Sequence, residues 1–194
     1  MKQIFTLLVT TCVCGFVSGQ EKKDLTLTFS AGALNSPYYD NARSETFYGF
    51  DFNYYLTNRT ILATSYFAGK HRYYESDLSN TNYLLSDDGT NAEAMYNVFS
   101  LQVKYKVAST ERFSVIPGVG VGLMTHTREY PYRIGTSESF QTSSWTDLAF
   151  PVSLELNYKL SKRWTAGIMG GLLIEPDFPI LALHAGPQLT YHLK

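Results

Sequence analysis

The chain has 194 residues, which suits a single domain. Its formal net charge is -1, and 17% of its residues are charged, against about 25% in soluble domains. The chain therefore lacks the basic footprint that a nucleic-acid partner requires. Aromatic residues reach 15%, mostly Tyr and Phe, and such rings suit an interface between hydrocarbon and water.

The first nineteen residues have the pattern of a secretory signal peptide. Lys2 is followed by a mostly apolar run over 4–17, and small residues precede a predicted cut after Gly19. An N-terminal membrane anchor is the alternative. Both cysteines, Cys12 and Cys14, lie in this segment. The predicted mature domain, 20–194, then has no disulfide and no thiolate metal site.

Beyond the signal segment the hydrophobic period is two, which predicts β-strands with one apolar face. In the second strand Tyr48, Phe50 and Phe52 alternate with Gly49 and Asp51. No apolar run here reaches the roughly twenty residues of a membrane helix. The alternation predicts eight strands, at 24–34, 46–56, 61–73, 94–107, 113–127, 146–160, 164–174 and 180–193.

The fifth strand carries a row of glycines, Gly118, Gly120 and Gly122, alternating with Val119 and Val121. A nucleotide-binding glycine loop needs a helix after it, and no helical pattern follows. We therefore expect the valines to face outward and the glycines to leave room inside a narrow barrel.

The third strand, 61–73, is less regular, and either facing is defensible. We favour Ala63, Ser65 and Phe67 outward, because Lys70 and Arg72 then point into the interior, where a charge costs less.

The connections alternate in length. The even-numbered ones are tight, at 57–60, 108–112 and 161–163, whereas 35–45, 74–93, 128–145 and 175–179 are longer or contain proline. Short turns at one end and long loops at the other are the plan of a transmembrane β-barrel.

Aromatic residues support this plan because they gather near the two ends of the strands, as interfacial girdles do. The short-turn group is Tyr54, Tyr105, Phe113, Tyr158, Trp164 and Tyr191. The long-loop group is Tyr48, Phe67, Tyr73, Phe150 and Phe178.

This layout resembles the small outer-membrane barrels of Gram-negative bacteria, the OmpA/OmpX/OmpW type with a porin-family barrel domain. The resemblance implies an all-β, eight-stranded, antiparallel, up-and-down transmembrane barrel over 20–194, delivered by the outer-membrane assembly machinery. Many members end in Phe, whereas this chain ends in Tyr191-His192-Leu193-Lys194, so Tyr191 or Leu193 would take the role of the terminal aromatic residue.

Polar residues of both charge signs take inward parity, and a narrow lumen favours their pairing. They are Asp51, Asn53, Lys104, Glu155, Asn157 and Lys159, together with Lys70 and Arg72 in the favoured facing of the third strand. We interpret them as a polar plug; the alternative is a gated ion path.

Catalytic and metal sites are not predicted. His126, His184 and His192 take inward parity without metal-ligand spacing. Ser153 and Glu155 share a face, but any Ser and Glu two residues apart would do so. We expect no enzyme, no cofactor and no catalytic residues.

The long loops are the other candidate site. Tyr, Ser and Thr in 128–145 form a contact-surface composition, and 74–93 is polar and acidic. Asp77, Asp87 and Asp88 lack the spacing of a calcium loop and would bind a divalent cation weakly.

We therefore predict a monomeric integral barrel in the lipid bilayer of the outer membrane, with a structural or surface-interaction role. Its contact surface would be the extracellular loops 35–45, 74–93 and 128–145, and its surface ligand is not identified. One alternative is a lipid-modifying barrel enzyme, an acyl hydrolase or transferase. Another is a soluble lipocalin-like periplasmic binder, which would bury its apolar face inside.

Overall fold

The computed structural model describes residues 24–37, 45–75, 90–134, 137–176 and 181–193. This part of the chain forms one antiparallel sheet of nine strands, which closes because β4 pairs with β6. The strands are β1 (Leu25–Asn35), β2 (Glu45–Tyr55), β3 (Thr60–Glu75), β4 (Thr90–Tyr105), β5 (Ala108–Ser109), β6 (Phe113–Ile134), β7 (Ser137–Lys159), β8 (Trp164–Ile174) and β9 (Ala182–Leu193).

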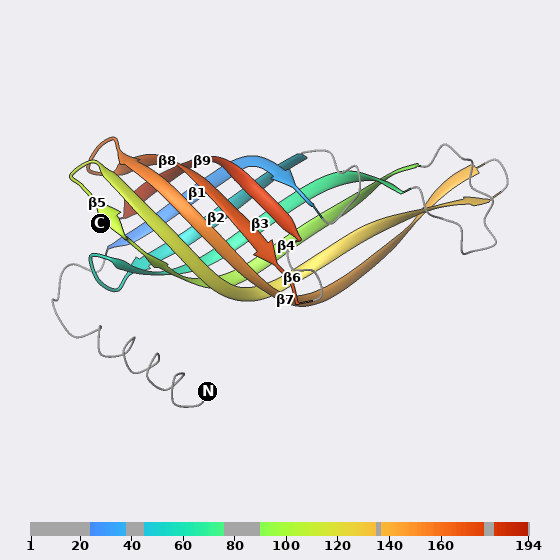
Figure 1. Cartoon of the computed structure of the whole chain (residues 1–194), viewed down its shortest axis with the longest axis horizontal. Coiled ribbons are helices and arrows are strands. Elements are labelled where there is room, and N and C mark those ends of the chain that lie inside the picture. The colour runs from blue at the N-terminus through green and yellow to red at the C-terminus, as the bar shows by residue number, and fades with distance from the viewer. Residues whose placement is uncertain (1–23, 38–44, 76–89, 135–136, 177–180, 194) are drawn as a thin grey trace, which may run out of the picture.

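The two-residue β5 pairs only with the start of β6, so eight strands form the wall (Figure 1). Each of them pairs with its neighbour along the chain, and β1 pairs with β9. The predicted eight-stranded up-and-down barrel is therefore confirmed. The predicted signal peptide, 1–19, lies outside the described residues. Among those residues the structure contains no helix long and apolar enough to span a membrane.

The outer wall of the barrel is apolar, whereas the interior is polar at its middle and short-turn end and contains a buried apolar cluster, with Leu34, Phe47 and Met124 among its members, toward the long-loop end. Phe99 and Val119 are each 59% exposed and Ile168 is 61% exposed, whereas Thr26 and Asn53 are buried. Large apolar side chains over the whole outer wall are the arrangement that hydrocarbon solvent requires. A soluble lipocalin-like barrel has the reverse arrangement, so the structure removes that alternative.

The glycine row of β6 faces the interior as predicted. A Cβ atom added at Gly120 would lie 2.5 Å from the carbonyl oxygen of Leu101 and 2.6 Å from Cγ of Gln102. Val119 and Val121, on the other face, are exposed. Glycine is therefore needed here because β4 approaches β6 without space for a side chain.

We expect Gly120→Val to destabilise the barrel by about 1–3 kcal/mol through overpacking. Urea unfolding in lipid vesicles would measure the change. Val119→Leu, one residue away on the open lipid face, is the matched control and should be close to neutral. Equal stability of Gly120→Val and the parent would contradict this account of the narrow interior.

The favoured facing of the third strand is wrong. Ala63 and Ser65 are buried, whereas Leu62 and Tyr66 are 40% and 38% exposed on the outside. Phe67 points inward and stacks on Phe47, with ring centroids 5.4 Å apart. Gly69 leaves room for this ring, because a Cβ atom added there would lie 3.2 Å from Cε1 and 3.3 Å from Cζ of Phe67.

Phe67 therefore does not belong to the outer girdle at the long-loop end, although Tyr48 and Phe150 face outward there. Tyr73 and Phe178 lie outside the described side chains. At the other end the structure exposes Tyr105, Phe113, Tyr158 and Trp164 near the short turns. The belt between the two ends is the part of the wall suited to a bilayer.

The three tight turns share one capping device. Each starts with Ser or Thr, whose side-chain oxygen accepts a hydrogen bond from the backbone N–H three residues later. The three bonds are Thr60 N–H to Thr57 Oγ1 at 2.9 Å, Phe113 N–H to Thr110 Oγ1 at 3.0 Å and Trp164 N–H to Ser161 Oγ at 3.1 Å. An arginine occupies the third position of each turn: Arg59, Arg112 and Arg163.

Candidate functional site

A buried ion-pair triad crosses the middle of the lumen. The Nζ atom of Lys104 donates to Oδ2 of Asp51 and to Oε1 of Glu155, at 2.6 Å each. The Lys104 side chain is 2% exposed. Asp51 lies on β2 and Glu155 on β7, which are four strands apart in the eight-stranded wall and so face each other across the lumen. The triad ties opposite sides of the barrel together.

Neutral side chains extend this network from the triad toward the short-turn end of the barrel. The Nε2 atom of Gln188 donates to Oδ1 of Asn157 at 2.7 Å and to Oε2 of Glu155 at 3.3 Å. The Nδ2 atom of Asn53 donates to Oγ1 of Thr28 at 3.0 Å. The predicted inward facing of Asn53, Asn157, Asp51, Lys104 and Glu155 is therefore confirmed, and the charges pair as predicted.

Lys70 and Arg72 do not lie in the lumen. Lys70 forms an ion pair with Glu93 at 2.5 Å, and Arg72 pairs with the same carboxylate at 3.1 Å. The Arg72 side chain is 52% exposed. These side chains mark the extracellular edge of the apolar belt, because charges on the lipid-facing wall are costly within hydrocarbon.

Aromatic and histidine rings fill the lumen between the triad and the long-loop end of the barrel. Four of them, on neighbouring strands, form one ladder of His71, Tyr96, His126 and Trp145, with successive centroids 5.3, 4.7 and 4.3 Å apart. His184 packs against Phe47 at 5.0 Å and Phe67 at 4.9 Å. Sequence reasoning missed His71, because the wrong facing of β3 placed it outside.

The histidines and the candidate Ser and Glu have separate surroundings. Glu155 is engaged by Lys104, and the Oγ atom of Ser153 donates to Oε1 of Gln102 at 3.4 Å. His192 contacts Oγ1 of Thr165 at 2.9 Å, at the short-turn end. Within the described ranges no group of three His, Cys, Asp or Glu side chains converges as metal ligands would.

The segment 128–145, predicted as a loop, is instead mostly a β-ribbon. Its pairing continues from Arg128↔Ser143 to Ile134↔Ser137. The β4–β6 pairing ends at Ala94↔Arg128, and the β7–β8 pairing begins at Phe150↔Ile174. Beyond those pairs β6 and β7 pair only with each other among the described strands, and Figure 1 shows them projecting past β1, β2, β8 and β9.

The other two predicted loops fall mainly outside the described residues, which omit 38–44 and 76–89. Asp77, Asp87 and Asp88 lie in the second of these gaps. Their predicted weak cation binding, and the contact role of 35–45 and 74–93, stay predictions.

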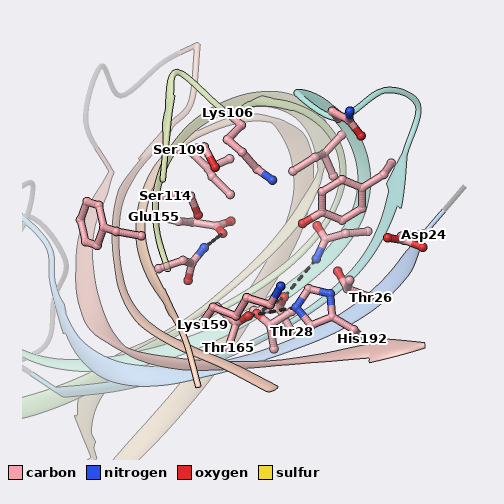
Figure 2. Close-up of a pocket in the computed structure, with 18 of the residues that line it drawn as sticks. Asp24, Thr26, Thr28, Lys106, Ser109, Ser114, Glu155, Lys159, Thr165 and His192 are labelled. Atoms are coloured by element: carbon pink, nitrogen blue, oxygen red, sulfur yellow. Dashed lines mark hydrogen bonds between the residues drawn. The ribbon is translucent and has the colours of Figure 1, made fainter. Parts of the chain in front are cut away.

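The lumen also contains a cavity at the short-turn end. Its volume is about 430 Å³, and Glu155, Lys106, Lys159 and His192 are among the residues that line it (Figure 2). The inward parity of Lys159 and His192 is confirmed, and Lys106 joins them from the connection after β4. Two of the three turn arginines, Arg112 and Arg163, also line it. The sequence signal that could have found the site is the inward parity of Lys104, Lys106 and Lys159 at the ends of their strands.

No family model and no curated protein sequence matches the chain. Among solved structures, Ail, the attachment invasion locus protein of Yersinia pestis, matches with a TM-score of 0.55 and 9% identity over 89% of this chain and 100% of that one. Ail in complex with the heparin analogue sucrose octasulfate gives 0.51 and 10% over 88% and 97%. Neisserial surface protein A gives 0.49 and 12% over 90% and 99%.

The closed fold and the apolar outer wall define the class of the protein. It has the architecture of the small eight-stranded outer-membrane β-barrels, which agrees with the resemblance seen in its sequence. The apolar wall makes a lipid bilayer its solvent.

Proposed function

We propose that the chain is an integral outer-membrane barrel that presents the β6–β7 ribbon as a contact surface. The projecting ribbon is the observation on which this proposal rests. The segments 129–134 and 137–142 add nothing to the closure of the barrel, because among the described strands they pair only with each other. A structural role in the barrel therefore does not explain their presence.

The ribbon has the chemistry of a surface that other molecules contact. Phe140 is 48% exposed, and the residues 141–144 that follow it are exposed and polar. At the base of the ribbon Thr127 and Ser144 pair across the strands at 3.1 Å, as do Thr125 and Thr146 at 3.3 Å. These cross-strand hydroxyl pairs stabilise the base of the ribbon.

The edge of β7 supplies a second means of contact. From 137 to 149 it pairs with β6 on one side, while its pairing with β8 on the other side starts at Phe150. An open strand edge presents backbone N–H and C=O groups to which an extended segment of another protein can add.

The lumen favours a contact role over a transport role. The Lys104 triad occupies the centre, and the ring ladder fills the space above it. Eight strands enclose a space that side chains can fill. The proposed role involves neither a solute path nor catalysis, and we expect a monomer delivered by the outer-membrane assembly machinery.

Shortening the ribbon tests this proposal. Replacing residues 129–142 by Asn-Gly would join Arg128 to Ser143 through a tight hairpin turn and leave the barrel intact. We expect bacteria displaying the shortened barrel to lose at least about tenfold in binding to heparin-coated beads and epithelial cells. The heparin probe is chosen because Ail, which shares the fold, forms a complex with a heparin analogue.

Cells displaying Val119→Leu at the same level are the control, and heat-modifiable migration on a gel checks that each variant is folded. Unchanged binding of the shortened barrel to both surfaces would refute the contact role of the ribbon.

A further inference from the structure

The cavity at the short-turn end is encircled by four residues at equivalent positions, which we call the mouth ring: Tyr55, Lys106, Lys159 and His192. Each donates its backbone N–H to a carbonyl oxygen of the adjacent turn or strand start. The acceptors are Asp24, Arg59, Arg112 and Arg163, at 3.0, 2.7, 2.7 and 2.9 Å respectively. The shared bonding pattern places the four residues at the same level of the barrel.

The order of the strands determines which members of the mouth ring are neighbours. Tyr55, Lys106, Lys159 and His192 lie at the ends of β2, β4, β7 and β9, which alternate with the other four strands around the wall. Lys106 therefore has Tyr55 on one side and Lys159 on the other. The Nζ atom of Lys106 lies 5.4 Å from the centroid of the Tyr55 ring, which agrees with this order. All four side chains line the cavity, and Figure 2 labels Lys106, Lys159 and His192 among them.

The cavity ends at the middle of the barrel, and its size suits a small molecule. Lys104 and Glu155, both part of the central triad, form its inner end. Its volume of about 430 Å³ falls in the range of small-molecule sites, about 300–1,000 Å³. Thr28, Asn53 and Thr190 line the wall between the triad and the mouth ring. A ligand would meet hydroxyl and amide groups on this wall, next to apolar side chains such as Ile61 and Ile116.

The charge in this cavity is positive. The triad has one cation and two carboxylates, so the charge of Lys104 is fully balanced there. Lys106 and Lys159, in contrast, form no ion pair with any residue that the structure describes. Burial, and then the charge of Lys159, lower the pKa of Lys106. Three further cationic residues line the cavity: Arg112, Lys162 and Arg163. Outside the triad its lining contains two carboxylates, Asp24 and Glu111.

Two facing ammonium groups without counter-charges repel each other, and an anion between them relieves that repulsion. A phosphate monoester carries close to two negative charges at neutral pH and offers three acceptor oxygens. We infer that the mouth ring binds the phosphate group of a small phosphorylated solute, with Lys106 and Lys159 as its charge partners. The Tyr55 hydroxyl is a further donor, and the polar wall receives the hydroxyl groups of the solute.

The same phosphate chemistry has two sources on this side of the membrane. One is a free phosphate ester in the aqueous compartment, and the other is a phospholipid headgroup from the adjacent leaflet. The cavity opens along the barrel axis at the mouth, between the strand ends, and this favours the free solute. Binding assays in discs of different lipid composition separate the two.

Equilibrium dialysis of the full barrel in phosphatidylcholine nanodiscs, at low ionic strength, would measure binding of radiolabelled phosphate and of glycerol 3-phosphate. We expect saturable binding with one site per barrel. The double variant Lys106→Gln/Lys159→Gln should lose at least about tenfold in affinity, because both charge partners are removed. Lys70→Gln, which removes the same charge at the extracellular rim, should bind as the parent does.

Heat-modifiable migration checks that every variant is folded, and the single variants, each losing about three- to tenfold, replace the double variant if it does not fold. Equal binding in phosphatidylcholine and phosphatidylglycerol discs supports a free solute, whereas weaker binding in phosphatidylglycerol discs shows that lipid headgroups compete for the ring. The inference is overturned if the parent barrel binds no phosphate, or if the double variant binds it as tightly as the parent.

Discussion

Replacing Lys104 by Ala is expected to lower the free energy of unfolding of the barrel by about 3–5 kcal/mol. Lys104 is the only described cation within 4 Å of either Asp51 or Glu155, and it is 2% exposed. Without it, two carboxylates remain in the narrow lumen with no counter-charge. The cost comes mainly from leaving those charges buried and unpaired.

Two further variants separate this cause from a simple loss of volume. The triple variant Lys104→Met/Asp51→Asn/Glu155→Gln removes all three charges and should recover most of the lost stability. Lys106→Ala removes a lysine two residues away that is only half-buried and has no ion pair among the described residues, and it should change stability by less than about 1 kcal/mol. Urea unfolding in vesicles, followed by tryptophan fluorescence, measures all three variants. A Lys104→Ala barrel as stable as the parent would disprove the structural role of the triad.

Arginine at position 119 tests the lipid-facing wall. Val119 is 59% exposed and lies near the middle of the outward row that runs from Phe113 to Leu123 on β6. Placing a guanidinium group there exposes it to hydrocarbon, so Val119→Arg should cost about 2–4 kcal/mol. The same urea unfolding assay in vesicles measures this cost.

Thr125→Arg provides the matched control on the same face of β6. Thr125 is paired with Thr146 at the base of the ribbon, beyond the apolar row, and a charge there can reach water. We expect a cost below about 1 kcal/mol for this change. If Val119→Arg folds into vesicles as stably as Thr125→Arg, the outer wall does not face hydrocarbon.

The charged residues of the lumen show what local sequence patterns can predict and what they cannot. Inward parity identified Lys104, Asp51 and Glu155, and the expectation that opposite charges pair was correct. The pairing partners themselves lie 53 and 51 residues from Lys104. Only the order of strands around the wall, and the register between them, determine that these three meet across the lumen.

The ribbon shows a different limit. Pro131 and the Ser- and Thr-rich stretch after it have the composition of a loop. The pairing of 129–134 with 137–142 satisfies their backbone groups across the two strands, and a strand continues wherever a partner strand accompanies it. Composition contains little information about that partnership.

The sequence by itself determined the strand period, the outward valines and inward glycines of β6, the tight turns and the closed barrel that these features require. Such features are local, because the alternation of a pleated strand depends on adjacent residues alone. Tertiary structure decided the facing of β3, where both parities contain apolar residues and the space beside Gly69 accepts the ring of Phe67. It also decided the mouth ring, whose members lie far apart in the chain and reach one level only when the wall closes.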